Sequence, residues 1–336
     1  MVRKTLNILL CVLGLFCFVN LHSYSIVFVH LGPDLPLFLN EATLQARLFN
    51  LTEDIYLLAN QEALNKVDKQ EILENMQKKI NVKIIPIESL QKSKEHIAFE
   101  KKSTHKISSK RGFWRFTTER FFVLDDFMQQ YKINDVVHLE SDTLLYRNLA
   151  EIMPVLSRHY KGIAAVFIND VYCIPCFVYF RDEKAIKNLS KHLAQHASEG
   201  ENDMVMLSLF RKKNSNHIID SLPIISEKYI NLRGLKSIKG HKANDDKVYC
   251  NHIDEFLSIF DGNAIGQFFG GADPSVSSAG PGVINKNSLF DPAALSYQWK
   301  NDEQGRKVPF MFFKGEKYRI NNLHIHSKNL KKFLSV

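Results

Sequence analysis

Two carboxylates stand at the end of an apolar segment and have the spacing of a metal site. The stretch "DVVHLESDTLLY", residues 135–146, places Glu140 and Asp142 on either side of one serine. A carboxylate near apolar surface is costly unless its charge is compensated. Residues two apart on extended backbone point to the same side, so both can reach one ion. Oxygen ligands suit Mg²⁺ or Mn²⁺, which complete their shell with substrate phosphates. Alternatively, Asp142 caps a helix near "LAEIM" and Glu140 is merely solvated.

The elements around this pair alternate between strand and helix patterns. Apolar runs predict strands at 25–32, 54–60, 81–87, 133–142, 161–168 and 175–182. Helical spacing predicts helices at 36–50, 69–80, 117–131, 183–197 and 201–213. Such alternation indicates an α/β fold, with a Rossmann-like, mostly parallel sheet flanked by helices. Ligands bind beyond the carboxyl ends of such strands, where Glu140 and Asp142 stand.

Three further expectations follow from the same pattern. The polar, basic stretch 91–115 reads as a surface loop. Thr117 or Thr118 is the expected N-cap of the helix that follows it. A short strand and then a basic end are expected near the C-terminus, at 318–333.

The strand followed by acid-x-Asp and "TLLY" resembles the Asp-x-Asp signature of GT-A-fold glycosyltransferases, with Glu in place of the first Asp. In the family-8-like branch, an arginine on the preceding helix touches the nucleotide sugar. Arg120 matches that placement, and Arg115 is the other candidate. The alternative for Arg120 is a plain ion pair with Asp125 or Asp126.

Later segments follow the order that this resemblance implies. "ENDMVML" stands where the family has a helix start near the donor sugar, which makes Asn202 and Asp203 candidates for catalysis. "NNLHIHSK" stands where the family has a late His and Lys that bind the metal and the diphosphate, so His324 or His326 and Lys328 are candidates. The usual Gly-x-x-Lys-Pro-Trp tail is absent, and His-x-His replaces a single His.

The resemblance implies a hexosyltransferase-like enzyme that uses Mn²⁺ or Mg²⁺ and a nucleotide-sugar donor. The acceptor, whether glycan, lipid or protein, is not specified. His30, Leu31, Gly32 and Asn60, which follow the first two strands, would hold the base and ribose. The branch favours retention of anomeric configuration. An inverting enzyme would instead need a carboxylate base, and Asp203 is the candidate.

Composition limits the other function classes. Of the 336 residues, 45% are hydrophobic and 24% charged, with a net charge of +8, which favours anionic partners. No zinc-finger spacing or RNP-like motif supports nucleic acid. No Gly-rich phosphate loop supports a phosphotransfer or nucleotidyltransfer enzyme. The remaining alternative is a secreted, non-catalytic carbohydrate- or nucleotide-binding protein with the same fold.

The N-terminus has the pattern of a targeting segment. Arg3 and Lys4 precede an uncharged apolar run, Thr5–Leu21. Residues 1–23 therefore predict a signal peptide or an uncleaved membrane anchor, and entry into the secretory pathway. The first strand follows almost at once, which favours cleavage and leaves one domain over residues 24–336. Association with a membrane through residues 5–21 is the alternative.

Two other segments each admit two interpretations. Cys173 and Cys176 form a single C-x-x-C, which predicts a structural disulfide or two buried thiols. In "FDGNAIGQFFGG", Asp261 and Gln267 either hold acceptor hydroxyls or occupy turn and core-edge positions.

Overall fold

The computed structural model describes residues 24–105, 112–214 and 218–336. The predicted targeting segment, residues 1–23, lies outside the described residues. Among the helices that are described, none has the length and apolar character required to cross a bilayer.

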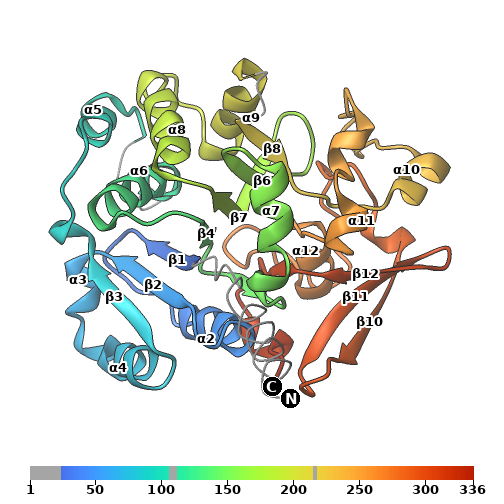
Figure 1. Ribbon diagram of the computed structural model, residues 1–336, viewed down its shortest axis with the longest axis horizontal. Helices are drawn as coiled ribbons and strands as arrows, with labels where there is room; N and C mark the ends of the chain where they lie inside the picture. Colours follow the sequence, from blue (N-terminus) through green and yellow to red (C-terminus); the bar gives the residue numbers. More distant parts are fainter. Residues whose placement is uncertain (1–23, 106–111, 215–217) are drawn as a thin grey trace, which may run out of the picture.

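A seven-stranded sheet forms the centre of the molecule (Figure 1). Its strands are β1 (Ser25–His30), β2 (Asp54–Ala59), β3 (Val82–Pro86), β4 (Val136–Leu139), β6 (Ile163–Phe167), β7 (Cys173–Phe180) and β8 (Ile219–Ser221). Their order is β3-β2-β1-β4-β7-β6-β8. The first four strands are parallel, as are β6 and β8, whereas β7 runs antiparallel to both of its neighbours. The expected mostly parallel α/β sheet is therefore confirmed.

Helices flank this sheet. They are α2 (Leu39–Phe49), α3 (Gln61–Leu64), α4 (Gln70–Lys78), α5 (Lys94–Lys102), α6 (Phe113–Tyr131), α7 (Met153–His159), α8 (Glu183–Gln195) and α9 (Asp203–Lys213). Three more helices, α10 (Glu227–Arg233), α11 (Ile253–Phe256) and α12 (Ala264–Gly270), lie with the C-terminal part of the chain in the right half of Figure 1. α6 is buried throughout from Thr118 to Met128. It lies between the sheet and the helices α5 and α8, which gather at the upper left of Figure 1.

The segment 91–115 is not a loop throughout, because α5 lies within it. The side chain of Ser93 accepts a hydrogen bond from the backbone N–H of His96 and so caps this helix. His96 and Phe99 are buried, and the ring of Phe99 stacks on Phe122 of α6 with 4.7 Å between centroids. Lysines on the exposed face make the segment look like a loop in the sequence, although its inner face is that of a packed helix.

The start of α6 also differs from the prediction. The helix begins at Phe113, with Gly112 before it in the left-handed region at φ 77°. Thr117 and Thr118 are inside the helix, and both hydroxyls donate to the carbonyl of Trp114. Neither threonine is the N-cap.

The C-terminal part adds two smaller sheets. β9 (Ser258–Ile259), β10 (Ser296–Asn301), β11 (Lys307–Phe313) and β12 (Glu316–Ile320) form one of them, in the order β10-β11-β12-β9. In the other, β13 (Asn322–His324) pairs antiparallel with β5 (Thr143–Leu145), so that His324 is opposite Thr143. The backbone N–H of Ile325 also donates to the carbonyl of Asp142 at 2.9 Å. This pairing carries the late histidine to the end of β4.

Asp261 and Gly266 explain the glycine-containing segment beside β13. The buried Asp261 carboxylate accepts backbone N–H bonds from Ile265 at 2.9 Å, Gly266 at 2.8 Å and His324 at 3.0 Å. A Cβ atom on Gly266 would lie 2.2 Å from the carbonyl oxygen of His324. Asp261 is thus a turn and core residue that fastens α12 to β13, and Gly266 permits that close approach.

A buried charge cluster joins α5 to α6. His96 Nδ1 lies 2.6 Å from Asp126 Oδ2, and His96 Nε2 lies 3.4 Å from Glu119 Oε1. Burial alone would lower the pKa of His96, but the carboxylates of Asp126 and Glu119 raise it from 6.5 to about 9. The cluster therefore contributes stability fully below pH 6.5 and loses it as the pH rises through 9.

We expect Gly266→Ala to lower the free energy of unfolding by about 1–3 kcal/mol, because the new methyl group meets rigid backbone. Urea denaturation measures this change. Gly280→Ala is the matched control, since nothing lies within 4 Å of its Cβ position. Equal stability of the two variants would contradict the close packing of α12 on β13.

We expect the wild type to lose on the order of 2–3 kcal/mol relative to His96→Gln as the pH rises from 6.5 to 9. The glutamine cannot carry the proton that the wild type releases over this range. Denaturation curves at a series of pH values measure the difference, and His105→Gln, outside the cluster, serves as control. Parallel pH profiles for wild type and His96→Gln would show that the imidazolium does not stabilise this contact.

Candidate active site

The two carboxylates of the opening motif follow β4 in a tight turn. The N–H of Glu140 donates to the carbonyl of Cys176 on β7 at 3.1 Å. The N–H of Thr143 donates back to the carbonyl of Glu140 at 3.0 Å, which closes the turn. Asp142 is 5% exposed, so it faces the protein interior rather than solvent. It does not cap the following helix, where Asn148 is the N-cap.

His324 completes a group of three with these carboxylates. Its Nε2 atom lies 3.2 Å from Glu140 Oε2 and 3.2 Å from Asp142 Oδ1. One potential ligand atom from each of the three residues lies within 4.8 Å of the others. The third member, His324, lies on β13, and the pairing of β13 with β5 determines how far its imidazole lies from the two carboxylates.

Each of the two carboxylates also binds a cation through the oxygen that does not face His324. Arg120, on α6, forms an ion pair with Glu140 Oε1 and a second one with Asp203 Oδ2 at 2.6 Å. Lys328 forms an ion pair with Asp142 Oδ2. The remaining oxygens, Glu140 Oε2 and Asp142 Oδ1, are therefore the ones that face His324. Arg120 does not make the alternative pair with Asp125 or Asp126.

These charges set the protonation states of the site. Burial alone would raise the pKa of both Asp142 and Glu140. His324 and Lys328 nevertheless hold the pKa of Asp142 well below its usual value, and Arg120 and His324 lower the pKa of Glu140. Burial alone would lower the pKa of His324, but Asp142 and Glu140 raise it. Both acids are therefore ionised at neutral pH, although Asp142 is buried and Glu140 is partly buried.

The arrangement fits a divalent cation. Two carboxylate oxygens and one imidazole nitrogen point at a common centre, and Mn²⁺ or Mg²⁺ accepts such a donor set. The Nδ1 atom of His324 is buried without a hydrogen-bond partner among the described residues. Of the two ring nitrogens, only Nε2 therefore contacts protein groups, and a cation held there would take the place of the imidazole proton that faces the two carboxylates.

His326 lies in the turn that follows β13, because the strand ends at His324, and it is not one of these three residues. Its ring centroid lies 4.5 Å from that of His324. Burial, and then the charge of His324, lower the pKa of His326 to about 4, so the ring is neutral. The structure therefore separates the two candidates, with His324 between the carboxylates and His326 beside it.

The candidates at the start of α9 occupy different environments. Asn202 is the N-cap of the helix, and its side-chain oxygen accepts the N–H of Val205 at 3.1 Å. Asp203 is 2% exposed and bound to Arg120. Burial raises the pKa of Asp203, and Arg120 opposes that increase. Asp203 therefore belongs to the charge network, whereas the amide oxygen of Asn202 is already engaged.

The candidates after β1 and β2 lie along the same sheet edge as Glu140, because β1 pairs with both β2 and β4. The N–H of Gly32 donates to Asn60 Oδ1 at 2.9 Å, and Asn60 Nδ2 donates to Glu88 Oε1 at 3.0 Å. His30 Nε2 is buried without a hydrogen-bond partner among the described residues, and burial lowers the pKa of His30 to about 4. Asn60 thus links the ends of three strands.

Glu88 and Asp273 are site neighbours that sequence reasoning missed. Glu88 fixes Asn60, and Asp273 lies 3.8 Å from Lys328. Both are single acids in polar surroundings, so no local pattern marks them. Arg115, the other arginine candidate, bonds Glu119 at 3.0 Å.

The C-x-x-C behind the site holds two free, buried thiols rather than a disulfide. Cys176 Sγ donates to the carbonyl of Asp261 at 3.1 Å. Burial raises the pKa of both Cys173 and Cys176 well above the usual value, so neither thiol is a thiolate nucleophile at neutral pH.

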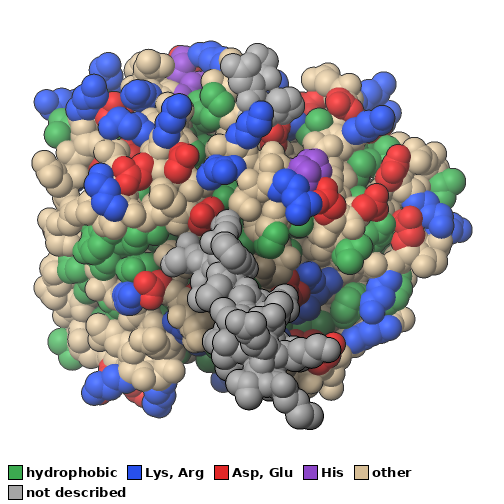
Figure 2. Space-filling model, in the orientation of Figure 1, with side chains coloured by type: hydrophobic (Ala, Val, Ile, Leu, Met, Phe, Trp, Pro, Cys, Tyr) green, Lys and Arg blue, Asp and Glu red, His purple; other side chains and the backbone are tan. Residues whose placement is uncertain are grey.

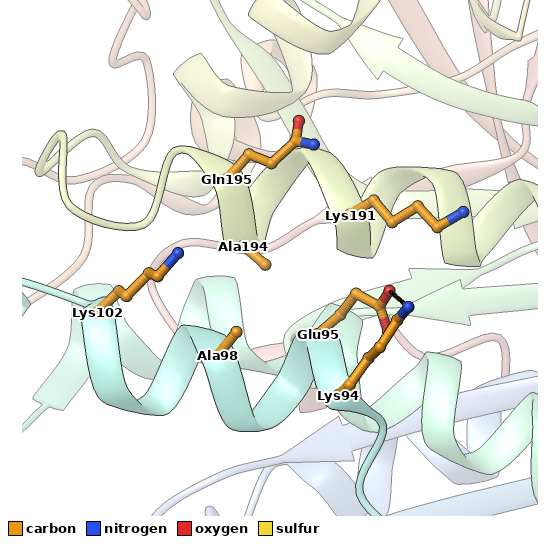
Figure 3. Close-up of a pocket in the computed structure, with 7 residues that line it drawn as sticks. All are labelled: Lys94, Glu95, Ala98, Lys102, Lys191, Ala194 and Gln195. Carbon is orange, nitrogen blue, oxygen red and sulfur yellow. Dashed lines mark ion pairs between the residues drawn. The ribbon is translucent and has the colours of Figure 1, made fainter.

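A separate open groove of about 250 Å³ lies between α5 and α8 (Figure 3). Lysine side chains border it, and Ala98 and Ala194 line its narrow part. Figure 2 shows many lysine and arginine side chains over these two helices. None of the residues around the carboxylates lines this groove, so it is not part of the candidate site.

No protein-family model and no curated protein sequence matches the chain. Among solved structures, mouse xyloside xylosyltransferase 1 is 11% identical over 62% of this chain and 90% of that one, with a TM-score of 0.42. An active-site mutant of LgtC is 10% identical over 67% and 81%, with a TM-score of 0.42. A cytidylyltransferase from Leptospira borgpetersenii is 12% identical over 60% and 76%, with a TM-score of 0.38. Glycosyltransferases, the class that the sequence resembles, are thus among the matching structures.

We expect Arg120→Gln to lower the free energy of unfolding by about 3–5 kcal/mol, because it leaves two buried carboxylates without their cation. Adding Asp203→Asn should recover part of that loss, since one of the stranded charges is removed. Lys78→Gln is the control, because its pair with Glu74 is exposed and contributes about 0–1 kcal/mol. Chemical denaturation measures all three. A small effect of Arg120→Gln, similar to that of the control, would contradict the buried network.

Proposed function

We propose that the protein is a metal-dependent glycosyltransferase that moves a sugar from a nucleotide-sugar donor to an acceptor. One observation carries the proposal: Glu140, Asp142 and His324 converge on one point at the carboxyl end of β4, with Arg120 and Lys328 beside it. Donor diphosphates carry negative charge and bind Mg²⁺ or Mn²⁺ through their oxygens, so both features of this site suit them.

Glu140, Asp142 and His324 would hold the ion. When bound, Mn²⁺ or Mg²⁺ would supply Lewis-acid stabilisation of the negative charge that develops on the leaving diphosphate. Asp261 holds the backbone of His324 and so keeps this ligand in place.

Lys328 is the residue best suited to bind the diphosphate directly. Its side chain is 33% exposed and bound to Asp142, so the ammonium lies between the site and solvent. Burial alone would lower the pKa of Lys328, but Asp142 raises it, which keeps the ammonium charged. A lysine provides a mobile point charge that can turn from Asp142 to a phosphate oxygen. That charge then stabilises the leaving group.

Arg120 has a different role, because its side chain is only 8% exposed and is held on both sides. It orients Glu140 towards the metal position and Asp203 towards the same space. For retention of anomeric configuration, which the family-8-like resemblance favours, no free carboxylate base is needed. Asp203 would then bind a hydroxyl of the donor sugar, beside Asn202 at the start of α9.

The nucleoside part of the donor would lie along the ends of β1 and β2. His30 offers a buried Nε2 atom without a partner among the described residues. At Gly32, φ is 118° and a Cβ atom would lie 3.3 Å from the Phe116 ring, so a larger residue would crowd this strand end. Asn60 keeps these two strand ends together through its bond to Gly32. In this arrangement the nucleobase would lie beside the ends of β1 and β2. The transferred sugar would lie on the other side of the carboxylates, near Asp203.

We expect a nucleoside diphosphate to bind tightly only with Mn²⁺ present, and Asp142→Asn to abolish that dependence. The isosteric amide removes the charge that attracts the cation while preserving the side-chain shape. Calorimetry with and without EDTA measures the coupling. Asp254→Asn, an exposed carboxylate on α11, is the control. Equal nucleotide affinity with EDTA and with Mn²⁺ in the wild type would rule out the metal-dependent site.

Turnover distinguishes an enzyme from a binding protein with the same site. Nucleotide-sugar donors are screened for slow hydrolysis without acceptor, and proton NMR follows the anomeric configuration of the released sugar. A retained configuration supports the proposed chemistry, and an inverted one makes Asp203 the base. Metal-dependent binding of the donors without any hydrolysis or transfer would favour the non-catalytic alternative.

A further inference from the structure

A short hairpin after α10, residues 236–242, carries several lysine side chains that form no ion pair among the described residues. Lys236 and Lys242 face each other directly across an antiparallel bridge. The N–H of Ser237 donates to the carbonyl of His241 at 2.9 Å, next to that pair. Like charges directly opposite each other in such a pair are destabilising. The hairpin therefore carries a cost that no contact among the described residues offsets.

The turn of the hairpin is rigid and exposes an aliphatic side chain. The N–H of Gly240 donates to the carbonyl of Ser237 at 3.0 Å, with Gly240 at φ 85°. The buried Ser237 hydroxyl also accepts the N–H of His241 at 2.9 Å. Ile238 is thus the first corner residue of a closed turn, and it is 65% exposed. Turn corners favour Gly, Pro, Asn, Asp and Ser, so an exposed isoleucine there has no structural reason.

Two more lysines border the same turn. Lys239 is the second corner residue, and its N–H donates to the carbonyl of Lys286 at 3.0 Å. Lys236, Lys239, Lys242 and Lys286 are all exposed, and no salt bridge joins any of them to an acid within the part of the chain that the structure describes. One apolar side chain is therefore surrounded by four unpaired cations.

We propose that the hairpin 236–242, together with Lys286, docks on an anionic lipid surface. Ile238 inserts at the boundary between headgroups and acyl chains, and the four lysines contact the headgroup phosphates. Amphipathic surfaces bind membranes through this combination of apolar burial and attraction to anionic lipid. The net charge of +8 adds a general attraction to such a surface. The four lysines alone would also suit a soluble polyanion, but the exposed Ile238 favours lipid.

This surface is separate from the carboxylates and from the groove between α5 and α8. It does not depend on the glycosyl-transfer proposal, and its test does not measure activity. It is also distinct from the N-terminal apolar run, so the readout must report on the hairpin itself.

Lysine footprinting of the full chain provides that local readout. Amine acetylation followed by mass spectrometry is compared in solution, with phosphatidylcholine vesicles, and with vesicles that also contain phosphatidylglycerol. We expect labelling of Lys236, Lys239, Lys242 and Lys286 to fall severalfold with the anionic vesicles only. The exposed Lys161 and Lys184 should keep their labelling and serve as controls. Unchanged labelling of the four lysines on anionic vesicles overturns the proposal.

Ile238→Ser separates a lipid surface from a soluble polyanion. We expect this variant to need about tenfold more anionic lipid for half-maximal protection, because one aliphatic side chain no longer inserts. Val276→Ser, which changes a side chain that is 84% exposed elsewhere, should behave as the wild type. Two results would assign the hairpin to a soluble polyanion and overturn membrane docking. In the first, heparin protects the four lysines and anionic vesicles do not. In the second, Ile238→Ser and the wild type need the same amount of anionic lipid.

Discussion

Two carboxylates at the carboxyl end of β4 remain ionised in the protein interior only because cations reach them from distant parts of the chain. Arg120 comes from α6, and His324 and Lys328 come from β13 and the residues after it. The buried Asp142 would not be tolerated there without them, since a buried, unpaired charge is one of the most expensive groups in a protein, and the partly buried Glu140 would carry a smaller cost. The positions of α6 and β13 relative to the sheet are therefore coupled to the electrostatics of the site.

A further layer of polar contacts holds the elements that carry those cations. Asp261 binds three backbone N–H groups and fixes β13 against α12, and Gly266 lets the two backbones approach. Glu119, the neighbour of Arg120, is bound by His96, so α5 stabilises the helix that supplies the arginine. Asn60 joins Gly32 and Glu88 across the sheet edge. None of these contacts involves the side-chain atoms that Glu140, Asp142 and His324 direct at one another, yet each determines where a site residue lies.

The sequence predicts the central sheet well because its strands are continuous apolar runs, and "DVVHLESDTLLY" marks the site because two acids end such a run. The sequence predicts less for a helix that has one packed face and one solvent-exposed face, and for side chains whose partners are distant in the chain. The sequence of α5 is typical of a loop because lysines cover its exposed face, and its buried side consists of just three residues, Glu95, His96 and Phe99. The N-cap role of Asn202 and the linking role of Asn60 depend on partners that local spacing does not specify. The difference between His324 and His326 likewise arises from the register of β13 against β5.

The distances along the chain between site residues have a consequence for how the molecule folds. Asp142 and Lys328 are 186 positions apart, and Arg120 and Asp203 are 83 positions apart. Contacts of such separation require large loops to close, which is slow and entropically costly. During folding, Asp142 has no cationic partner until β13 and Lys328 arrive, whereas Glu140 can pair earlier with Arg120, which is 20 positions away in the chain. The complete charge network therefore forms only when β13 pairs with β5, and we expect Asp142 to lose its water late in folding.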